Sequence, residues 1–302
     1  MRKPALALAL MAIAGAAAFY GLTIPRHVDA RIAAIMENGD AAKGERMFWA
    51  GGCASCHAAK GAKGEAKKSL GGGLALVTPF GTFHAPNISP DKLTGIGGWT
   101  GENFANAMLY GVSPQGSHYY PAFPFTSYTR MQAVDVADLW AFLKGLPAVA
   151  HNNIPHALPL PFRLRRGLGL WKLLFLDQNP VAKIDSTDKE QVLGRYLVEG
   201  PGHCAECHTP RNLIGGADKS RWLAGAVAPE GKGRIPNITT HENGIGHWSR
   251  ADVESYLEIG FTPEFDAVGG AMAAVQENMA KLPPADRQAI AAYLRSLVPV
   301  PN

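Results

Sequence analysis

The sequence predicts an all-α protein made of two copies of one small helical domain. An internal repeat is the first observation behind this prediction. Each copy contains Cys-x-x-Cys-His, then Pro-Asn-Ile followed by Ser or Thr, then Gly-Ile-Gly-x-Trp. The second observation is that stretches with helical apolar spacing alternate with loops rich in Gly and Pro, of which the chain has 34 and 22. A chain of 302 residues is long enough for two such domains.

Helices are expected at matching places in the two copies. The Trp of each copy opens a segment of helical character, and these segments end at Gly111 and Gly260. Ser249 with Asp252 resembles a capping box at the start of the second segment. A closing helix follows in each copy, at 134–146 and 286–297. Its apolar residues share one face: Val136, Leu139, Trp140 and Leu143 in the first copy, and Ile290, Tyr293, Leu294 and Leu297 in the second.

All four cysteines belong to the two Cys-x-x-Cys-His patterns: Cys53, Cys56, Cys204 and Cys207. This pattern is the attachment signature of a c-type haem, in which two thiols bond to the haem and the next His binds its iron. We therefore predict two covalently bound haem c groups, with His57 and His208 as the proximal iron ligands. Structural zinc and disulfides are the alternatives. A zinc ion would need four ligands close together, whereas the two cysteine pairs lie far apart along the chain.

Both copies resemble class I cytochrome c domains, in which a first helix leads into the cysteine motif and a helix closes the domain. More narrowly, the chain resembles the cytochrome c subunits of membrane-bound bacterial alcohol, gluconate and sugar dehydrogenases. The resemblance covers nearly everything after residue 40, including the two repeated loops and the run from Gly111 to Ala122. It implies an electron carrier. Those subunits often carry three haems and this chain has two attachment motifs, so the resemblance does not fix the partner dehydrogenase.

The second haem has a clear candidate for its sixth iron ligand. A His/Met pair is usual for a c-type haem that transfers electrons. Counting from the equivalent glycines, Gly111 and Gly260, places Phe123 and Met272 at the same position of the two copies. The related subunits carry their distal Met in this loop, so Met272 is the predicted ligand. Met279 is its nearest competitor.

The first haem lacks a Met at this position, and Phe123 cannot bind iron. His118, five residues upstream in the same loop, is the leading substitute. Met131, near the start of the closing helix, is a second possibility, and a five-coordinate iron covered by Phe123 is a third. The choice separates a low-spin haem that relays electrons from an open haem that binds peroxide, nitric oxide or carbon monoxide.

Five further residues are expected to surround the haems. A ligating His usually donates its other N–H to a carbonyl, and in class I cytochromes the Pro of the Pro-Asn loop supplies it. The resemblance therefore implies Pro86 and Pro236 in this role. Trp99 and Trp248 either donate an indole N–H to a haem propionate or are plain core residues. Arg211 either neutralises a propionate or is a surface charge.

The repeat and the composition divide the chain into four parts: an N-terminal membrane anchor or signal segment (1–30), domain 1 (31–149), a Pro-rich, basic and apolar linker (150–190), and domain 2 (191–302). The centre of the linker, 162–176, is apolar and basic. We expect it to pack against both haem domains with its Arg residues paired to acidic groups. The alternative is a helix lying on anionic lipid.

An uncharged stretch runs from Ala5 to Ile24, after Arg2 and Lys3. As a helix it is about 30 Å long, which is enough to cross a bilayer, whereas a cleavable signal has a shorter apolar core. Small residues at 14–18 offer cleavage sites and favour the opposite interpretation. We expect an uncleaved anchor. Covalent haem is attached outside the cytoplasm, so the working part is expected on the periplasmic side of the bacterial inner membrane.

The formal net charge of +4 does not suggest a nucleic-acid partner. Four lysines follow the first motif closely: Lys60, Lys63, Lys67 and Lys68. They are either a solvated loop or a docking patch for an acidic redox partner.

We therefore predict a dihaem electron carrier with no catalytic residues of its own and no metal besides haem iron. It would accept electrons from a periplasmic dehydrogenase or another redox protein and pass them to a quinone, oxidase or cytochrome. The alternative is a dihaem peroxidase-like oxidoreductase with an open first haem. A distal acid–base group would help that chemistry, and only His118, or more remotely His84, is available. Gas sensing is a third possibility, for which the sequence offers no output domain.

Overall fold

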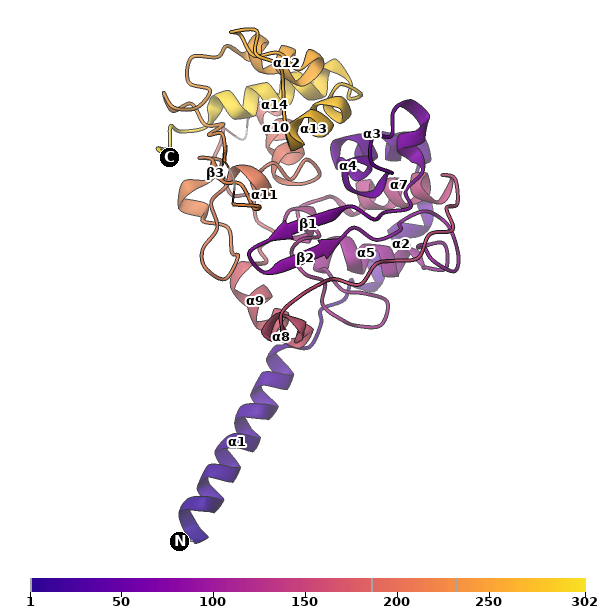
Figure 1. The fold of residues 1–302 in the computed structure, drawn as a ribbon, viewed down its shortest axis with the longest axis vertical. Helices are drawn as coiled ribbons and strands as arrows, with labels where there is room; N and C mark the ends of the chain where they lie inside the picture. Colours follow the sequence, from indigo (N-terminus) through magenta and orange to yellow (C-terminus); the bar gives the residue numbers. More distant parts are fainter. Residues whose placement is uncertain (1, 186, 232) are drawn as a thin grey trace.

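The computed structural model describes residues 2–185, 187–231 and 233–302. Residue 1 of the N-terminal segment, residue 186 of the linker and residue 232 of domain 2 lie outside the described residues. Figure 1 shows two helical domains joined by a linker, with one long helix extending alone from the globular part. The predicted all-α class with two tandem domains is confirmed.

The two domains share one series of helices in the same order, and domain 1 has two additional short helices, α2 and η1, before that series. Domain 1 consists of α2 (Ala30–Ile35), η1 (Met36–Asn38), α3 (Ala41–Ala50), α4 (Cys53–His57), η2 (Gly64–Lys68), α5 (Gly101–Tyr110), α6 (Phe125–Tyr128) and α7 (Ala133–Lys144). Domain 2 consists of α10 (Lys189–Glu199), α11 (Ala205–His208), η4 (Lys219–Arg221), α12 (Arg250–Ile259), α13 (Ala271–Met279) and α14 (Pro284–Ser296). The linker carries α8 (Leu160–Arg163), η3 (Arg165–Gly167) and α9 (Leu168–Phe175).

In each domain the first and last helices cross at a glycine. A Cβ on Gly44 of α3 would collide with the backbone carbonyl of Asp138 on α7. A Cβ on Gly194 of α10 would collide in the same way with the carbonyl of Ala289 on α14. The glycines therefore allow the two helix backbones to approach closely, and this crossing positions the cysteine motif that follows α3 or α10.

The predicted middle helices are confirmed with their caps. Ser249 and Asp252 form the capping box of α12, and Thr100 with Asn103 forms the equivalent box on α5. Both helices end at a glycine in the left-handed conformation, Gly111 with φ 60° and Gly260 with φ 79°. Side chains rarely adopt that backbone conformation, which explains why both copies end this helix with Gly.

The predicted closing helices are confirmed as α7 and α14, whose ends lie within two residues of the expected bounds. The residues expected on their inner faces are buried. Together with α3, α5, α10 and α12 they form one apolar core that continues across both domains.

Two short antiparallel hairpins were not predicted. The first pairs β1 (Ala75–Thr78) with β2 (Gly81–His84), and the second pairs β3 (Ala226–Val227) with β4 (Arg234–Ile235). Each lies between the cysteine motif and the Pro-Asn loop of its domain. Thr82 of β2 also exchanges two backbone hydrogen bonds of 2.9 Å with Ala157, which ties the linker to domain 1.

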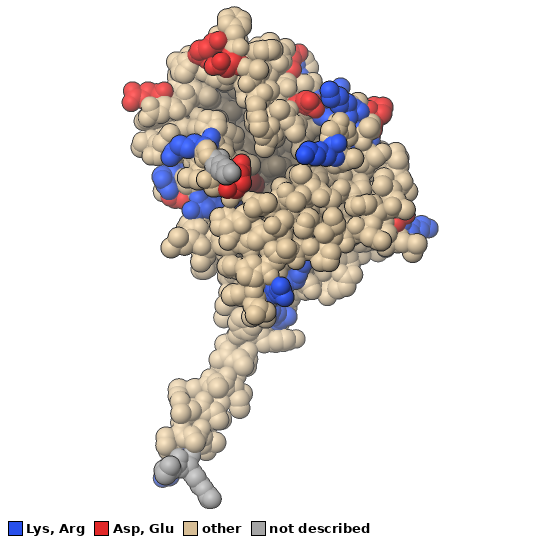
Figure 2. Space-filling view, viewed as in Figure 1, with Lys and Arg blue, Asp and Glu red and all other residues tan. Residues whose placement is uncertain are grey.

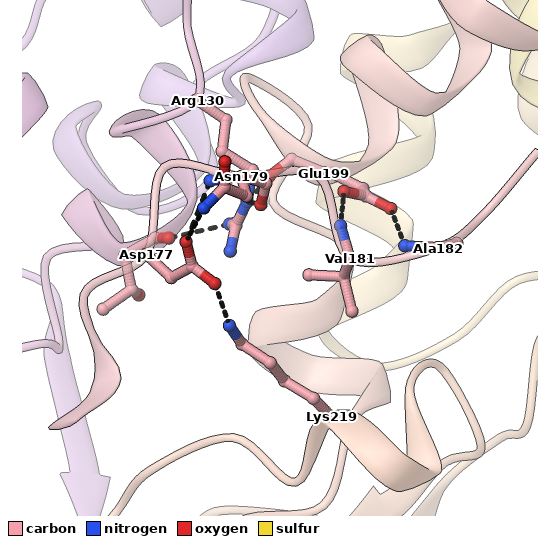
Figure 3. A network of polar contacts seen from close by, with 8 residues as sticks. Arg130, Asp177, Asn179, Val181, Ala182, Glu199 and Lys219 are labelled. Carbon is pink, nitrogen blue, oxygen red and sulfur yellow. Dashed lines mark hydrogen bonds and ion pairs between the residues drawn. The ribbon is translucent and has the colours of Figure 1, made fainter. Parts of the chain in front are cut away.

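The linker contacts both domains, as its first interpretation expects, but the arginines of its centre donate to carbonyl and hydroxyl oxygens and not to the expected acidic groups. Figure 3 shows its C-terminal part, where Asp177 pairs with Lys219 of domain 2 at 2.6 Å. The carbonyl of Asn179 accepts a hydrogen bond of 2.9 Å from Arg130 of domain 1.

The buried carboxylate of Glu199 accepts hydrogen bonds from the backbone N–H groups of Val181 and Ala182 at 2.7 and 2.9 Å. The described residues 176–185 are therefore held in place by charge and by backbone hydrogen bonds.

The extended helix is α1 (Arg2–Leu22). Its span Lys3–Leu22 is the one described helix that is long and apolar enough to cross a membrane. A signal sequence near an N-terminus passes the same test of length and composition.

Candidate haem sites

The two proximal histidines are oriented in the same way. Each lies at the end of a short helix, α4 or α11, that carries a cysteine motif. The Nδ1 of His57 lies 2.7 Å from the carbonyl of Pro86, and the Nδ1 of His208 lies 2.8 Å from the carbonyl of Pro236. Nδ1 therefore donates and Nε2 remains available for a metal. Burial lowers the pKa of both imidazoles more than the carbonyl bonds raise it, which favours the neutral, ligating form.

The Pro carbonyls are held in place by a buried asparagine that follows each of them. Asn87 accepts a hydrogen bond from the N–H of Ser89 at 2.9 Å, and Asn237 accepts one from Thr239 at 2.8 Å. Both asparagines also donate to the chain after the closing helix, Asn87 to Val149 and Asn237 to Val300. The repeated Pro-Asn pair carried this signal, but sequence reasoning assigned a role to the Pro alone.

The four cysteines form no disulfide with one another. Among the described residues no group of three or more His, Cys, Asp or Glu side chains is placed to hold a metal ion. The donor set, two thiols and one imidazole with a free Nε2 in each domain, fits covalent haem and does not fit a shared zinc site.

The distal loops of the two domains have the same backbone pairing. Val112 pairs with His118 in domain 1, and Phe261 pairs with Ala267 in domain 2. The N–H groups of Tyr119 and Val268 each donate to the glycine carbonyl that ends the preceding helix, both at 2.7 Å. The structure thus supports the counting that placed Phe123 and Met272 at equivalent positions.

Met272 is the second residue of α13, where it is partly buried against the core. Its competitor Met279 lies at the opposite end of the same helix and is fully packed in the core. This placement keeps Met272 as the candidate ligand for the second haem.

The structure does not support His118 as a ligand of the first haem. Its Nε2 lies 3.0 Å from the carbonyl of Thr23, and its Nδ1 lies 3.1 Å from the Nζ of Lys172. Both ring nitrogens are therefore occupied by protein partners, and the ring is buried between the end of α1 and α9. The contact with Thr23, which is distant in sequence, draws His118 away from the distal loop. Sequence spacing alone did not predict that contact.

Met131 holds a core position rather than a distal one. It is buried just before α7, and Leu282 occupies the equivalent place before α14. Phe123 instead lies among aromatic rings, with centroids 5.8 Å from Tyr119 and 5.6 Å from Tyr128. These placements favour a first haem that Phe123 covers.

The Arg211 side chain binds a carboxylate within the second motif. Its guanidinium is therefore not free to neutralise a haem propionate. Its guanidinium pairs with the Glu206 carboxylate and donates to the carbonyl of Gly215 at 2.8 Å. Trp99 and Trp248 are partly buried against the core. Their role as propionate donors stays a prediction.

The two attachment motifs meet at the interface between the domains. Glu206, between the cysteines of motif 2, accepts hydrogen bonds from Thr126 and Ser127 of α6 at 2.6 and 2.7 Å. Ser55, the equivalent residue of motif 1, accepts one from Asn278 of α13 at 2.7 Å. Each motif thus contacts the helix that follows the distal loop of the other domain. Sequence reasoning had assigned no role to Ser55, Glu206 or Asn278.

Two further contacts close this interface. The Nε2 of His203 lies 3.2 Å from the carbonyl of Gly51, which also accepts a hydrogen bond from the hydroxyl of Tyr128. Cys56 and Cys207, the second cysteines of the two motifs, also lie near each other at this interface. His203, which sequence reasoning left as a loop residue, thus lies where the two haem sites meet.

The cytochrome c family model matches residues 41–147 and 193–298, which are the two domains just described. The chain belongs to the cytochrome c family. It is 54% identical over 288 residues to a diheme cytochrome c-type protein of Cereibacter sphaeroides, covering 95% of each chain. It is 37% identical to the fructose dehydrogenase cytochrome subunit of Gluconobacter japonicus and 35% identical to the gluconate 2-dehydrogenase cytochrome c subunit of Pantoea cypripedii.

These dehydrogenase subunits are longer than the chain. The matches cover 84% of the chain but only 52% and 59% of the two subunits. This cytochrome c therefore carries two covalently bound haem c groups and is an electron-transfer protein.

The lysines that follow the first motif are partly neutralised within this cytochrome. Lys67 pairs with Glu277 of domain 2, and Lys68 lies 3.0 Å from Glu45 and 3.2 Å from Glu65. Two of these four lysines are thus occupied by internal ion pairs, which favours their interpretation as a solvated loop.

Proposed function

We propose that this cytochrome is a membrane-tethered carrier that receives electrons from a periplasmic dehydrogenase, or another redox protein, and passes them to a quinone, oxidase or cytochrome of the respiratory chain. Relatives named as cytochrome subunits of fructose, gluconate and alcohol dehydrogenases support a dehydrogenase as the donor. The span Lys3–Leu22 supports a tether on the periplasmic side of the membrane.

One observation carries the proposal: both attachment motifs lie at the domain interface, where Ser55 and Glu206 make equivalent contacts. Bound haem supplies one-electron exchange at its iron. The protein supplies two attachment sites that are held at one interface by partly buried hydrogen bonds. Such an arrangement suits a relay that accepts an electron at one site and releases it at the other.

A deletion experiment in the source bacterium tests the donor. Membranes that lack this protein should lose oxygen uptake with one dehydrogenase substrate, such as fructose, gluconate or ethanol. The full chain should restore that uptake, whereas a Cys53→Ser/Cys204→Ser variant should not. Unchanged uptake with every dehydrogenase substrate would overturn the proposed respiratory role.

The second candidate is a peroxidase-like oxidoreductase, and the observation in its favour is Phe123 where domain 2 has Met272. Against it, His118 is held by Thr23 and Lys172. The alternative acid–base group, His84, has its Nδ1 against the carbonyl of Pro155 at 3.1 Å. We expect the reduced protein to bind one carbon monoxide, at the first haem, without peroxide turnover above background. Rapid peroxide turnover would favour the enzyme.

A further inference from the structure

We propose that the surface formed by α8, α9 and the adjoining loop lies in the headgroup region of the membrane that α1 enters. This inference rests on the proposed role of α1 as a tether. We call this surface the α8–α9 face. It is made of Leu160, Phe162, Leu164, Leu170, Leu173 and Leu174, with Leu213 and Ile214 beside them.

The apolar side chains of the α8–α9 face are unusually exposed. Leu160 and Leu164 are each 75% exposed, Leu174 is 70% exposed and Leu213 is 98% exposed. The loop that carries Leu213 is attached to α9, because the indole N–H of Trp171 donates to the carbonyl of Ile214 at 2.8 Å. Single exposed leucines are ordinary, but a group of them on one surface marks an interaction site.

The position of this face relative to α1 is fixed by buried contacts. Thr23, directly after α1, is fully buried, and its hydroxyl accepts a hydrogen bond of 2.7 Å from the Nε of Arg166. Arg166 also donates to the carbonyl of Tyr20 at 2.9 Å and lies over the Tyr20 ring at 4.4 Å. A Cβ on Gly169 of α9 would lie 2.7 Å from the Cα of Thr23. The tether therefore leaves the globular part directly against η3 and α9, as Figure 1 shows.

The charges around the face fit an anionic lipid surface. Residues 160–176 contain Arg163, Arg165, Arg166 and Lys172 and no Asp or Glu. Lys172 is buried, but the three arginines lie within four residues of each other between the exposed leucines. Figure 2 shows basic side chains beside the base of the tether. Apolar residues at acyl-chain level with Arg at the headgroups are the pattern of an interfacial segment.

Site-specific thiol labelling of the haem-loaded full chain tests this inference. The four native cysteines are bonded to haem, so an introduced cysteine is the only free thiol. Leu160→Cys and Leu174→Cys probe the face. Val298→Cys is the matched control, because Val298 is 73% exposed and follows α14 in the domain that lies away from α1. Each variant is reconstituted into nanodiscs containing phosphatidylglycerol and treated with a charged, water-soluble maleimide.

We expect labelling at positions 160 and 174 to be about tenfold slower than at position 298, after normalisation to each unfolded variant. The protection should weaken in nanodiscs of phosphatidylcholine alone. Equal labelling rates at all three positions would overturn the inference. Protection that arises only after a dehydrogenase is added would also overturn it, and would assign the face to a protein partner. A protein that does not co-elute with nanodiscs would reject the tether itself, while its electron transfer in solution would be unaffected.

Discussion

Arg46 and Tyr196 occupy equivalent positions on α3 and α10, and each binds the equivalent aspartate of the other domain. Arg46 donates to both carboxylate oxygens of Asp286 on α14, at 2.6 and 2.8 Å. The Tyr196 hydroxyl donates to the carboxylate of Asp135 on α7. The two domains therefore meet across an approximate twofold axis, which also relates the contacts of Ser55 and Glu206. This symmetry places each attachment motif against the corresponding helix of the other domain, α6 or α13.

Arg46→Met should destabilise the protein by about 2–3 kcal/mol, because it leaves the buried Asp286 carboxylate without its partner. Chemical denaturation of the haem-loaded protein measures the change. Asp286→Leu in the same chain should recover a substantial part of the loss, since no unpaired charge is then buried. A double variant that is no more stable than Arg46→Met would contradict the assigned pairing.

Gly44→Ala and Gly194→Ala should each lower the free energy of unfolding by about 2 kcal/mol, because a Cβ at either position collides with the facing helix backbone. In a solvent-exposed helix the change from Gly to Ala stabilises the protein by about 1 kcal/mol. The sign of the change in unfolding free energy therefore shows whether the facing backbone is in contact. Lys43→Ala on the exposed side of α3 is the control and should change stability by less than about 0.5 kcal/mol. Stabilisation by Gly44→Ala would show that the helices do not cross at this residue.

Met272→Ala should open the second haem. The reduced variant is expected to bind one additional carbon monoxide per molecule, and the potential of the second haem should fall because thioether ligation raises it. Met279→Ala is the control: it should cost about 2–4 kcal/mol of stability through the cavity it leaves in the core, with no new binding site for carbon monoxide. If Met279→Ala opens the haem instead, the ligand assignment is reversed.

Phe123→Met should restore to domain 1 the arrangement found in domain 2. The added thioether is expected to bind the first haem iron, to abolish its carbon monoxide binding and to raise its potential. His118→Ala should leave the spectrum of the first haem unchanged, because both ring nitrogens contact protein groups. A shift from low to high spin in His118→Ala would restore His118 as a ligand.

Lys172 should make stability depend on pH above neutrality. Burial lowers its pKa to about 7 from the ordinary value of 10.5. The unfolded chain therefore binds more protons than the folded chain between these values, so stability should rise with pH in this window, by up to about 1.4 kcal/mol per pH unit. Denaturant titrations at pH 7, 8 and 9 measure the slope. The Lys172→Met variant should lose this part of the pH dependence. An equal slope of unfolding free energy against pH in both proteins would contradict the lowered pKa of Lys172.

The sequence predicted the haem sites well because their chemistry is local. The cysteine motifs, the Pro carbonyls and the Ser249 capping box each depend on residues within about thirty positions of one another, and the structure shows the expected hydrogen bonds at Pro86 and Pro236. The repeat also carried information, because it aligns Phe123 with Met272.

The remaining features depend on contacts between distant residues. His118 is placed by Thr23 of the N-terminal segment. The interface was not predicted, because nothing local in Arg46 or Asp286 indicates that they face each other. The β-hairpins are too short to carry a strand pattern that sequence reasoning would separate from loops.

One measurement tests the central claim, that the two haem sites form a single relay. Pulse radiolysis places at most one electron on each molecule of the fully oxidised protein, and absorption follows which haem holds it. The adjacent attachment sites predict that the electron redistributes between the haems within about a millisecond, at a rate independent of protein concentration. A redistribution rate proportional to protein concentration would mean that electrons move only between molecules, which would contradict the relay.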